Sequence, residues 1–175
     1  VYKRQAYERA VLFEKERNNM FLVLGEKPSV AQALAEVLGA KKRADGYLEG
    51  EDCIVSWCLG HLAEYAAPEV YDERYKKWEF TDLPIFPKTW ELRIAKDKNE
   101  QLDVLKELLN RKDFEYVVNA CDAGREGELI FKRVYDLSKS SLPVKRLWIS
   151  SMEEQAICDG FSNLKNGKEY ERLCE

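Results

Sequence analysis

Residues 21–39 read FLVLGEKPSVAQALAEVLG, which is an apolar run, a polar turn and a helical pattern in succession. The first four residues, Phe21–Leu24, are typical of a strand that is buried on both faces. Pro28 suits the first turn of a helix, and Gly39 suits the end of one. Between them the apolar residues recur at helical spacing: Val30, Leu34, Val37 and Leu38. A strand that passes directly into an amphipathic helix predicts one unit of an α/β domain.

The same alternation of strand and helix continues along the chain. The patterns predict further strands at 53–58, 90–94, 116–119 and 145–149, and further helices at 102–109, 129–137 and 151–161. Ser151 and Glu154 have the spacing of a capping box at the start of the last helix. The aromatic, proline-containing stretch from about residue 68 to residue 88 is interpreted as an ordered excursion. We therefore expect an α/β fold with a mostly parallel central sheet flanked by helices.

The composition excludes several classes of protein. A chain of 175 residues with 45% hydrophobic and 34% charged residues predicts one ordinary globular domain. No apolar run approaches the roughly 20 residues that span a bilayer, and the N-terminus lacks a secretion signal, so we expect a cytoplasmic protein without a membrane partner. Five widely spaced cysteines favour reduced, mostly buried thiols over disulfides or a zinc site. The net charge of −4 argues against a free module that grips nucleic acid by phosphate neutralisation alone.

Acidic residues follow two of the predicted buried strands. Glu26 comes after the strand at 21–24, and the segment from Asp122 to Glu128 comes after the strand at 116–119. The carboxyl ends of parallel strands meet at one edge of a sheet, so these carboxylates can converge on one crevice. Oxygen ligands of this kind suit Mg²⁺. The alternative is that Asp122 is a turn residue and that Glu126 and Glu128 compensate a helix dipole.

Together these stretches resemble a known family. GEKPS at residues 25–29 and NACDAGREGELI at residues 119–130 are similar to the two motifs of the Toprim domain of type IA and type II topoisomerases, bacterial primases and some nucleases. Three more stretches resemble the topoisomerase III branch of the type IA enzymes: WCLGHL at 57–62, LPIFP at 83–87 with Trp90-Glu91 after it, and RLWISS at 146–151. The resemblance covers residues 20–175. It implies a Rossmann-like Toprim domain at 20–150 and the start of a further helical domain at 151–175. Residues 1–19 are then an N-terminal extension before Met20, and the sequence leaves open whether they are native.

The resemblance also implies roles for the acids. Glu26 matches the Toprim glutamate, which lies at the scissile phosphate, helps to bind metal and takes part in proton transfer at the 3′ oxygen. Asp122 and Glu126 match the first and third acids of the D-x-D-x-E motif, and Gly124 stands at the second position. This departure favours one Mg²⁺, held by Glu26, Asp122 and Glu126, with Mn²⁺ as a substitute. Glu128 is interpreted as a structural or supporting acid.

Basic residues and glycines complete the two motifs. Lys27 and Arg125 match residues near the phosphate, where fixed positive charge stabilises developing negative charge; the alternative is a pair of solvated cations. His61, the only histidine, matches a position near bound DNA, although a lone histidine is often structural. Gly124 and Gly127 would permit a tight turn and a close approach of the backbone.

The implied activity is a DNA topoisomerase reaction that needs no ATP. A type IA enzyme cuts one strand with a tyrosine, keeps a 5′-phosphotyrosine link, passes a strand through the gap and reseals it. None of the nine tyrosines lies in a segment that resembles the nucleophile region, so we expect that tyrosine in domains beyond this chain. This chain alone is then expected not to relax DNA. The expected partners are single-stranded or negatively supercoiled DNA and the remaining domains of the same polypeptide.

Two other functions stay open. A Toprim nuclease would use the same acids to activate water without a tyrosine, and a non-catalytic remnant would only bind DNA or a protein partner. An aromatic group in the excursion could stack on bases: it comprises Tyr71, Tyr75, Trp78, Phe80 and Phe86. Packing of these side chains in the core or within the excursion is the preferred interpretation.

Overall fold

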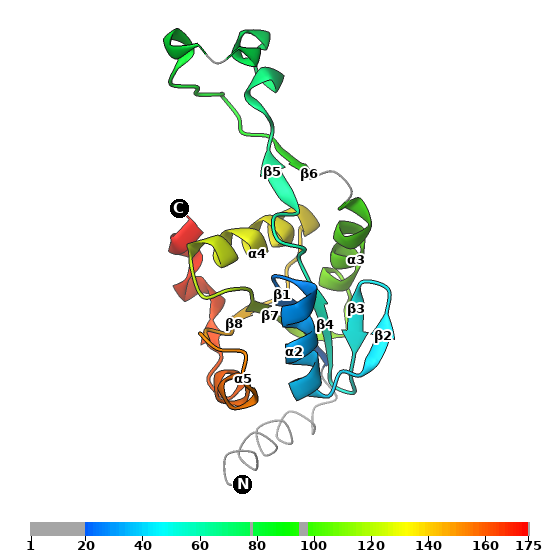
Figure 1. Ribbon diagram of the computed structural model, residues 1–175. Helices are drawn as coiled ribbons and strands as arrows, with labels where there is room; N and C mark the ends of the chain where they lie inside the picture. Colours follow the sequence, from blue (N-terminus) through cyan, green and yellow to red (C-terminus); the bar gives the residue numbers. More distant parts are fainter. Residues whose placement is uncertain (1–19, 78, 95–97, 175) are drawn as a thin grey trace.

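The computed structural model describes residues 20–77, 79–94 and 98–174, and it has a central sheet with helices on both faces (Figure 1). The N-terminal extension that was predicted at 1–19 lies outside the described residues. In the described part of the chain the main sheet has seven strands. Their order across the sheet is β2 (Lys42–Ala44), β3 (Tyr47–Glu49), β4 (Cys53–Trp57), β1 (Met20–Gly25), β7 (Phe114–Ala120), β8 (Val144–Arg146) and β9 (Lys165–Asn166). The central four, β4, β1, β7 and β8, run parallel, which confirms the predicted α/β class.

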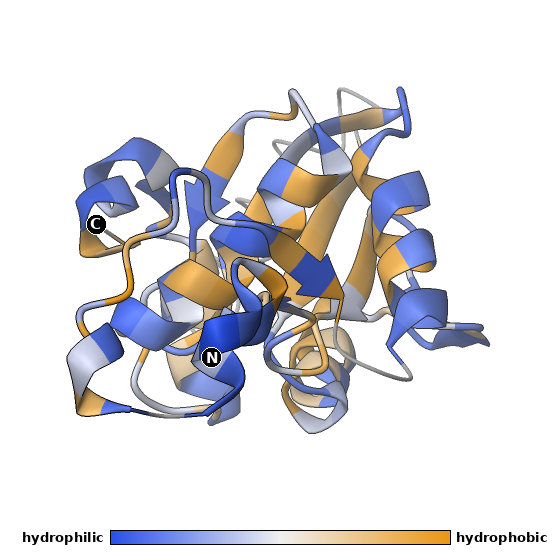
Figure 2. Cartoon of the chain, turned by 90° about the horizontal axis from the view of Figure 1, so that it is seen from above, coloured by the Kyte–Doolittle hydropathy of each residue, from blue (hydrophilic) through white to orange (hydrophobic). Residues whose placement is uncertain are grey.

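Among the residues that the structure describes, two α-helices pack on each face of this sheet. Alternate residues of β1 point to opposite faces: Leu22 and Leu24 pack with α3 (Asn99–Leu109) and α4 (Arg125–Ser138), whereas Val23 packs with α2 (Pro28–Leu38) and α5 (Glu154–Phe161). All three side chains are fully buried. Figure 2 shows the apolar strands enclosed between helices whose outer faces are hydrophilic. The fold is therefore a three-layer sandwich with a core on each side of the sheet.

The connections bring the carboxyl ends of β1 and β7 side by side. From β1 the chain passes through α2 to the β2–β3–β4 side of the sheet, and it later returns to β7 on the other side. The register pairs Gly25 with Ala120, so β1 and β7 end side by side. Ligands of open α/β sheets bind outside the carboxyl ends of the strands at such a reversal. The residues that follow Gly25 and Ala120 are therefore brought to one place.

An arm, residues 63–94, leaves the body after β4. Its stem is a separate two-stranded antiparallel sheet of β5 (Ala63–Tyr65) and β6 (Leu92–Ile94). Beyond the stem it forms three short 3₁₀ helices, η1 (Pro68–Val70), η2 (Glu73–Lys76) and η3 (Phe80–Asp82), which project away from the sheet (Figure 1). The prediction of an ordered excursion is confirmed for the described residues; Trp78 lies outside them.

Some local predictions were wrong. The β2–β3 hairpin was not predicted, and the strand that was expected at 145–149 ends at Arg146. Ser151 does not cap α5: that helix begins at Glu154 after Glu153, and the Ser151 hydroxyl accepts a hydrogen bond from the Glu153 N–H at 3.2 Å. The hydroxyl therefore closes a local turn before the helix.

Residues 151–174 pack on the same body. Ile157 of α5 is fully buried in the core under α2, and β9 pairs antiparallel with β8. Two short 3₁₀ helices follow, η4 (Gly167–Glu169) and η5 (Glu171–Cys174), and η5 packs against α4. That this segment also opens a further helical domain of a longer chain stays a prediction. No helix in the described residues is long and apolar enough to cross a membrane.

Candidate active site

Glu26 directly follows the last residue of β1, and the loop after β4 contacts its backbone. Its side chain is buried, and its Oε1 atom lies 3.4 Å from Nζ of the largely exposed Lys27. The backbone carbonyl of Glu26 accepts a hydrogen bond from the Gly60 N–H at 2.9 Å. Pro28 then begins α2, so the chain turns away from the sheet directly after the acid and its lysine. The hydrogen bond from Gly60 therefore holds the backbone of Glu26, and the positive charge of Lys27 lies beside its carboxylate.

His61 reaches this edge from the loop that follows β4. Leu59 and Gly60 both have left-handed backbone angles, with φ of 53° and 66°, and for a leucine this conformation is strained. The Lys98 ammonium holds the loop by donating to the carbonyls of Leu59 and His61, each at 3.0 Å. As a result, Nε2 of His61 lies 3.2 Å from Oε1 of Glu126, although 65 positions separate the two residues. His61 thus contacts a predicted metal ligand directly.

The acidic segment after β7 forms a loop and the first turn of α4. Asp122, Arg125 and Glu126 are exposed at this edge, and Gly124 precedes the helix. Gly127 lies against the loop: a Cβ built on it would come within 2.2 Å of the Asp122 carbonyl oxygen. The predicted close approach is confirmed for Gly127. At Gly124 an added Cβ would meet nothing within 4 Å, and its φ of 175° suits any residue, so the expected need for glycine is wrong there.

A buried ion pair under the loop was missed from the sequence. The Arg146 guanidinium, only 1% exposed, is paired with the Glu128 carboxylate. It also donates hydrogen bonds to the carbonyls of Cys121 at 2.6 Å and Asp122 at 2.8 Å. Arg146 therefore clamps the backbone that carries the predicted ligand Asp122. The available signal was that two charged residues, Lys145 and Arg146, begin the strand that was predicted at 145–149.

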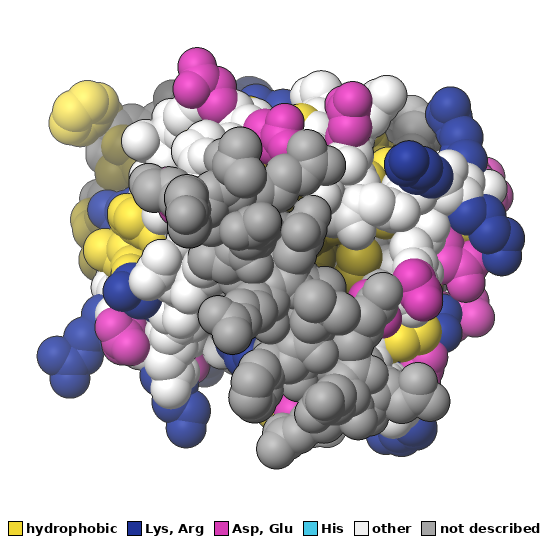
Figure 3. All heavy atoms as spheres, turned by 90° about the horizontal axis from the view of Figure 1, so that it is seen from below, with side chains coloured by type: hydrophobic (Ala, Val, Ile, Leu, Met, Phe, Trp, Pro, Cys, Tyr) yellow, Lys and Arg dark blue, Asp and Glu magenta, His cyan; other side chains and the backbone are white. Residues whose placement is uncertain are grey.

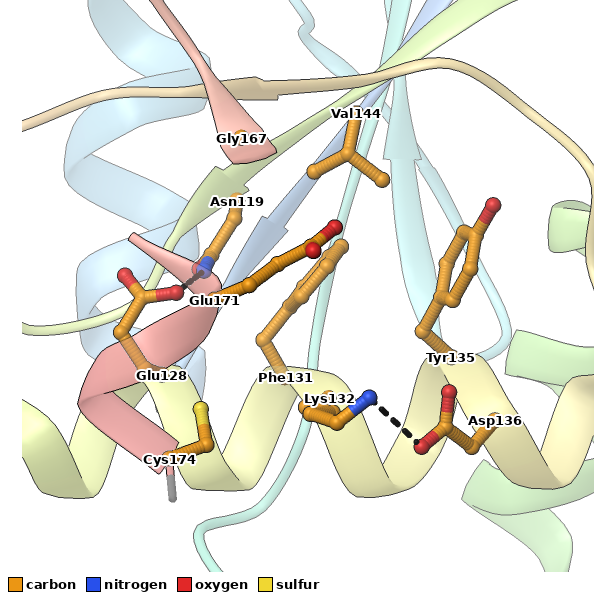
Figure 4. A pocket seen from close by; sticks show the side chains of 10 residues that line it. All are labelled: Asn119, Glu128, Phe131, Lys132, Tyr135, Asp136, Val144, Gly167, Glu171 and Cys174. Atoms are coloured by element: carbon orange, nitrogen blue, oxygen red, sulfur yellow. Dashed lines mark hydrogen bonds and ion pairs between the residues drawn. The ribbon is translucent and has the colours of Figure 1, made fainter. Parts of the chain in front are cut away.

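Glu128 is structural, as the sequence predicted. Its second carboxylate oxygen accepts a hydrogen bond from the Asn119 side chain at 3.1 Å, drawn as a dashed line in Figure 4. Burial raises the pKa of Glu128 above its ordinary value, while the Arg146 charge and the hydrogen bonds from Arg146 and Asn119 oppose that rise. The same carboxylate lines a cavity of about 210 Å³ between α4, β8 and η5. Glu128 thus faces away from the exposed acids and supports them through Arg146.

The cysteines near the site are free thiols. Cys58 and Cys121, at the ends of β4 and β7, are both buried, and the hydrogen bond between them together with burial raises the pKa of Cys121 well above its ordinary value. Such thiols are poor nucleophiles. All five cysteines are free, and three are buried, which confirms the prediction of reduced, mostly buried thiols.

The predicted metal ligands share one edge but do not form a coordination shell. In residues 20–174 as far as they are described, no group of three or more His, Cys, Asp or Glu is arranged so that it could hold a metal ion. Glu126 is turned to His61 and Glu26 to Lys27. The donor chemistry of Glu26, Asp122 and Glu126 nevertheless fits Mg²⁺, because all three offer carboxylate oxygens.

The aromatic group of the arm is only partly packed. The Tyr71 ring lies edge-on to Trp90, with the ring centres 6.0 Å apart, and its hydroxyl accepts a hydrogen bond from the Glu91 N–H at 2.9 Å. Phe80 and Phe86, in contrast, are 93% and 80% exposed. The preferred interpretation of packing is therefore confirmed for Tyr71 and wrong for these two phenylalanines.

Comparisons with known proteins show the family of this domain. The family model described as "Toprim domain" matches residues 21–152. The chain is 49% identical over 152 residues to the DNA topoisomerase 3 of Bacillus cereus, which is 87% of this chain and 21% of that protein. It is 50% identical over 151 residues to the DNA topoisomerase 3 of Shouchella clausii, again over 21% of the relative. The chain thus spans about a fifth of the length of these relatives.

A solved structure shares the fold. It is the full-length topoisomerase I of Thermotoga maritima, which matches with a TM-score of 0.56 and 18% identity over 86% of this chain and 22% of that one. At this identity the match supports the fold alone. The match to the family covers three quarters of the sequence, and it includes both acidic motifs. The chain therefore belongs to the Toprim domain family, and over that domain it is similar to DNA topoisomerase 3.

Proposed function

We propose that this chain is the Toprim part of a type IA DNA topoisomerase of the topoisomerase III kind. The observation that carries the proposal is the convergence of two distant acidic motifs, at Glu26 and at Asp122–Glu126, where the sheet reverses its strand order. That convergence occurs in a chain about half identical to named DNA topoisomerases over this domain. In the proposal the complete enzyme cuts one DNA strand, holds it as a 5′-phosphotyrosine, passes a strand and reseals without ATP.

The carboxylates would hold one divalent cation. Glu26, Asp122 and Glu126 are the proposed ligands of Mg²⁺, which Mn²⁺ could replace, and the bound ion would supply positive charge at the scissile phosphate. Glu126 would leave His61 when it binds the ion, since Nε2 of His61 lies within hydrogen-bond distance of its carboxylate. Glu26 is buried, and there a carboxyl group can exchange a proton with the 3′ oxygen without competing bulk water.

Lys27, Arg125 and His61 would contact the phosphate backbone. Lys27 lies beside Glu26, and Arg125 begins α4, so both charges are near the proposed ligands. A helix N-terminus adds partial positive charge at the same place. On the face seen from below, the acidic and basic side chains outside the grey part are interspersed along the rim (Figure 3). DNA, single-stranded or negatively supercoiled, would therefore bind at the carboxyl edge of the sheet, and a cytoplasmic location belongs to the same proposal.

The first test of the proposal uses two proteins. One is this chain alone; the other is a hybrid in which this chain replaces the matched segment of the Bacillus cereus DNA topoisomerase 3. With Mg²⁺ or Mn²⁺, we expect the hybrid to relax supercoiled DNA and this chain to leave end-labelled single-stranded DNA intact. In the hybrid, Glu26→Ala should lower the relaxation rate by about 10²–10⁴-fold, the usual contribution of a general acid or base.

A matched variant and the nuclease alternative complete this test. Glu36→Ala makes the same chemical change on the exposed face of α2 and should leave relaxation unchanged. Cleavage of the labelled DNA by this chain alone, lost in its Glu26→Ala variant, would establish a Toprim nuclease and overturn the proposal. Equal relaxation rates of the hybrid and its Glu26→Ala variant would contradict the proposed catalytic role of Glu26.

A further inference from the structure

Lys98 is a partly buried lysine whose ammonium group contacts backbone carbonyls rather than an acid. It directly precedes α3, and its Nζ atom donates hydrogen bonds to the carbonyls of Leu59 and His61, each at 3.0 Å. Among the residues whose positions are described, no carboxylate forms an ion pair with it. Partial burial of a cation without a counter-charge is unfavourable unless hydrogen bonds compensate it. What Lys98 stabilises is therefore the backbone of the loop after β4.

The loop that Lys98 holds has an unfavourable backbone conformation. Leu59 and Gly60 have φ angles of 53° and 66°. For a leucine the left-handed region is strained, and such residues persist where the surrounding structure holds them. The two carbonyls that accept from Lys98 belong to the residues on either side of Gly60. Lys98 therefore bridges the turn at the point where the chain would otherwise relax.

The ring of His61 depends on this backbone for its position. Its Nε2 atom lies 3.2 Å from Oε1 of Glu126, but its Nδ1 atom is buried and has no hydrogen-bond partner among the residues described. Buried polar atoms usually have such a partner. Once Glu126 turns to the proposed cation, the ring loses its contact at Nε2 as well. The hydrogen bonds that then place His61 are those of its backbone, and Lys98 provides one of them.

Gln101, one helical turn after Lys98, holds the strand end that leads into the same loop. Its side-chain amide donates hydrogen bonds to the Trp57 carbonyl at 2.9 Å and to the Ser56 hydroxyl at 3.2 Å. Side chains three positions apart lie on the same face of a helix. The start of α3 therefore holds the chain from the end of β4 to His61.

We propose that Lys98 is a positioning residue of the reaction, which places His61 for contact with the DNA phosphate backbone. The inference rests on the proposed function, because that function supplies the phosphate. Nε2 is the ring nitrogen that reaches the edge of the sheet, so it can donate to a phosphate oxygen when Glu126 leaves it. The Lys98 ammonium group is engaged by two carbonyls, so it acts through His61 and not on the DNA itself.

The first test uses the single histidine of the chain as a probe. In the metal-free protein, nuclear Overhauser effects between the His61 ring and the Glu126 side chain report their contact. We expect these effects in the parent chain and in Lys98→Arg, whose guanidinium has enough donors for both carbonyls. We expect their loss in Lys98→Met. Lys106→Met is the matched control: it removes a charge from the same helix, where Lys106 pairs with Asp103, and it should keep the effects.

The second test measures DNA relaxation by the hybrid described above. Lys98→Met should lower the relaxation rate by about 10–100-fold, the scale of a displaced positioning group. In a hybrid that already carries His61→Ala, the same change should lower the rate by less than about twofold, because the residue through which Lys98 acts is gone. A lysine with a merely structural role would lower the rate equally in both backgrounds. Lys98→Arg should restore most of the activity, and Lys106→Met should leave it unchanged.

The remaining outcomes contradict one proposal or the other. Nuclear Overhauser effects that persist in Lys98→Met, or that are absent from the parent chain, would overturn the inference, as would a His61→Ala hybrid as active as the parent. Lys98→Gln, which is shorter and uncharged, replaces Lys98→Met in both tests if circular dichroism shows that the methionine variant does not fold. An active hybrid in which the Lys98 and His61 losses add overturns this inference alone. A parent hybrid that does not relax DNA, with the effects lost in Lys98→Met, overturns the proposed function and leaves the placement of His61 by Lys98 intact.

Discussion

The Arg146→Met variant is expected to unfold with a free energy about 3–5 kcal/mol lower than that of the parent chain, as is usual when one partner of a buried ion pair is removed. The guanidinium is 1% exposed, and methionine fills similar volume without its charge or donors. The change leaves the buried Glu128 carboxylate without its cation, and it leaves the carbonyls of Cys121 and Asp122 without a donor. Urea denaturation followed by circular dichroism measures the difference.

Two controls separate this effect from a general loss of charge. The Arg146→Met, Glu128→Leu double variant should recover much of the lost stability, because it removes both charges from the core. Lys132→Met breaks the exposed ion pair with Asp136, at 3.1 Å, and should change the free energy of unfolding by less than about 1 kcal/mol. An Arg146→Met variant as stable as the parent would show that the pair is not formed in solution.

Gly127→Ala is expected to distort the acidic loop and to lower the free energy of unfolding by about 1–3 kcal/mol, the usual effect of overpacking. The added Cβ would come within 2.2 Å of the Asp122 carbonyl oxygen, and backbone cannot rotate away as a flexible side chain can. The same carbonyl accepts a hydrogen bond from Arg146 at 2.8 Å, so a shift of the loop also weakens the clamp. Thermal and urea unfolding measure the loss.

Gly124→Ala is the matched control, three positions earlier, at the residue that directly precedes α4. Its Cβ would meet nothing within 4 Å, and its extended backbone accepts alanine, so stability should stay within about 0.5 kcal/mol of the parent. Equal losses at both glycines would contradict the geometry of the loop. In the hybrid, Gly127→Ala should also reduce Mg²⁺-dependent relaxation more strongly than Gly124→Ala, since it displaces Asp122.

The central strands and helices could be predicted because burial imposes a pattern on their residues. β1 and the middle of β7 are buried on both faces, so Phe21–Leu24 and Tyr116–Val118 read as apolar runs, and α2 and α4 repeat apolar residues at helical spacing. The β2–β3 hairpin was not predicted, because its strands are three residues long and mostly polar. Its turn did carry a signal, Asp45-Gly46, and Gly46 has a φ of 80°. β9, of two residues, has too few side chains to form any pattern.

The sequence predicted which acidic residues belong to the candidate site, but it did not predict which residues they contact. β1 and β7 are neighbouring parallel strands, so Glu26 and Asp122, which follow them, lie at one edge of the sheet. The sequence predicted this edge, because both acids follow apolar strand patterns. The contact between His61 and Glu126 depends instead on the loop at Leu59, whose left-handed backbone no sequence pattern required. The role of Arg146 could not be predicted either. Most of its hydrogen bonds go to backbone carbonyls, which every residue type provides, so no sequence pattern marks them.

The position of Arg146 in the chain also affects when the site can form. A ribosome adds Glu26, His61, Asp122 and Glu126 to the chain before it adds Arg146. A nascent polypeptide that has emerged only through α4 therefore contains all three proposed metal ligands, yet the backbone around Asp122 still has no guanidinium beneath it. The site is completed only when β8 emerges and pairs with β7. Any deletion that removes β8 should thus abolish the site while every acid remains in the sequence.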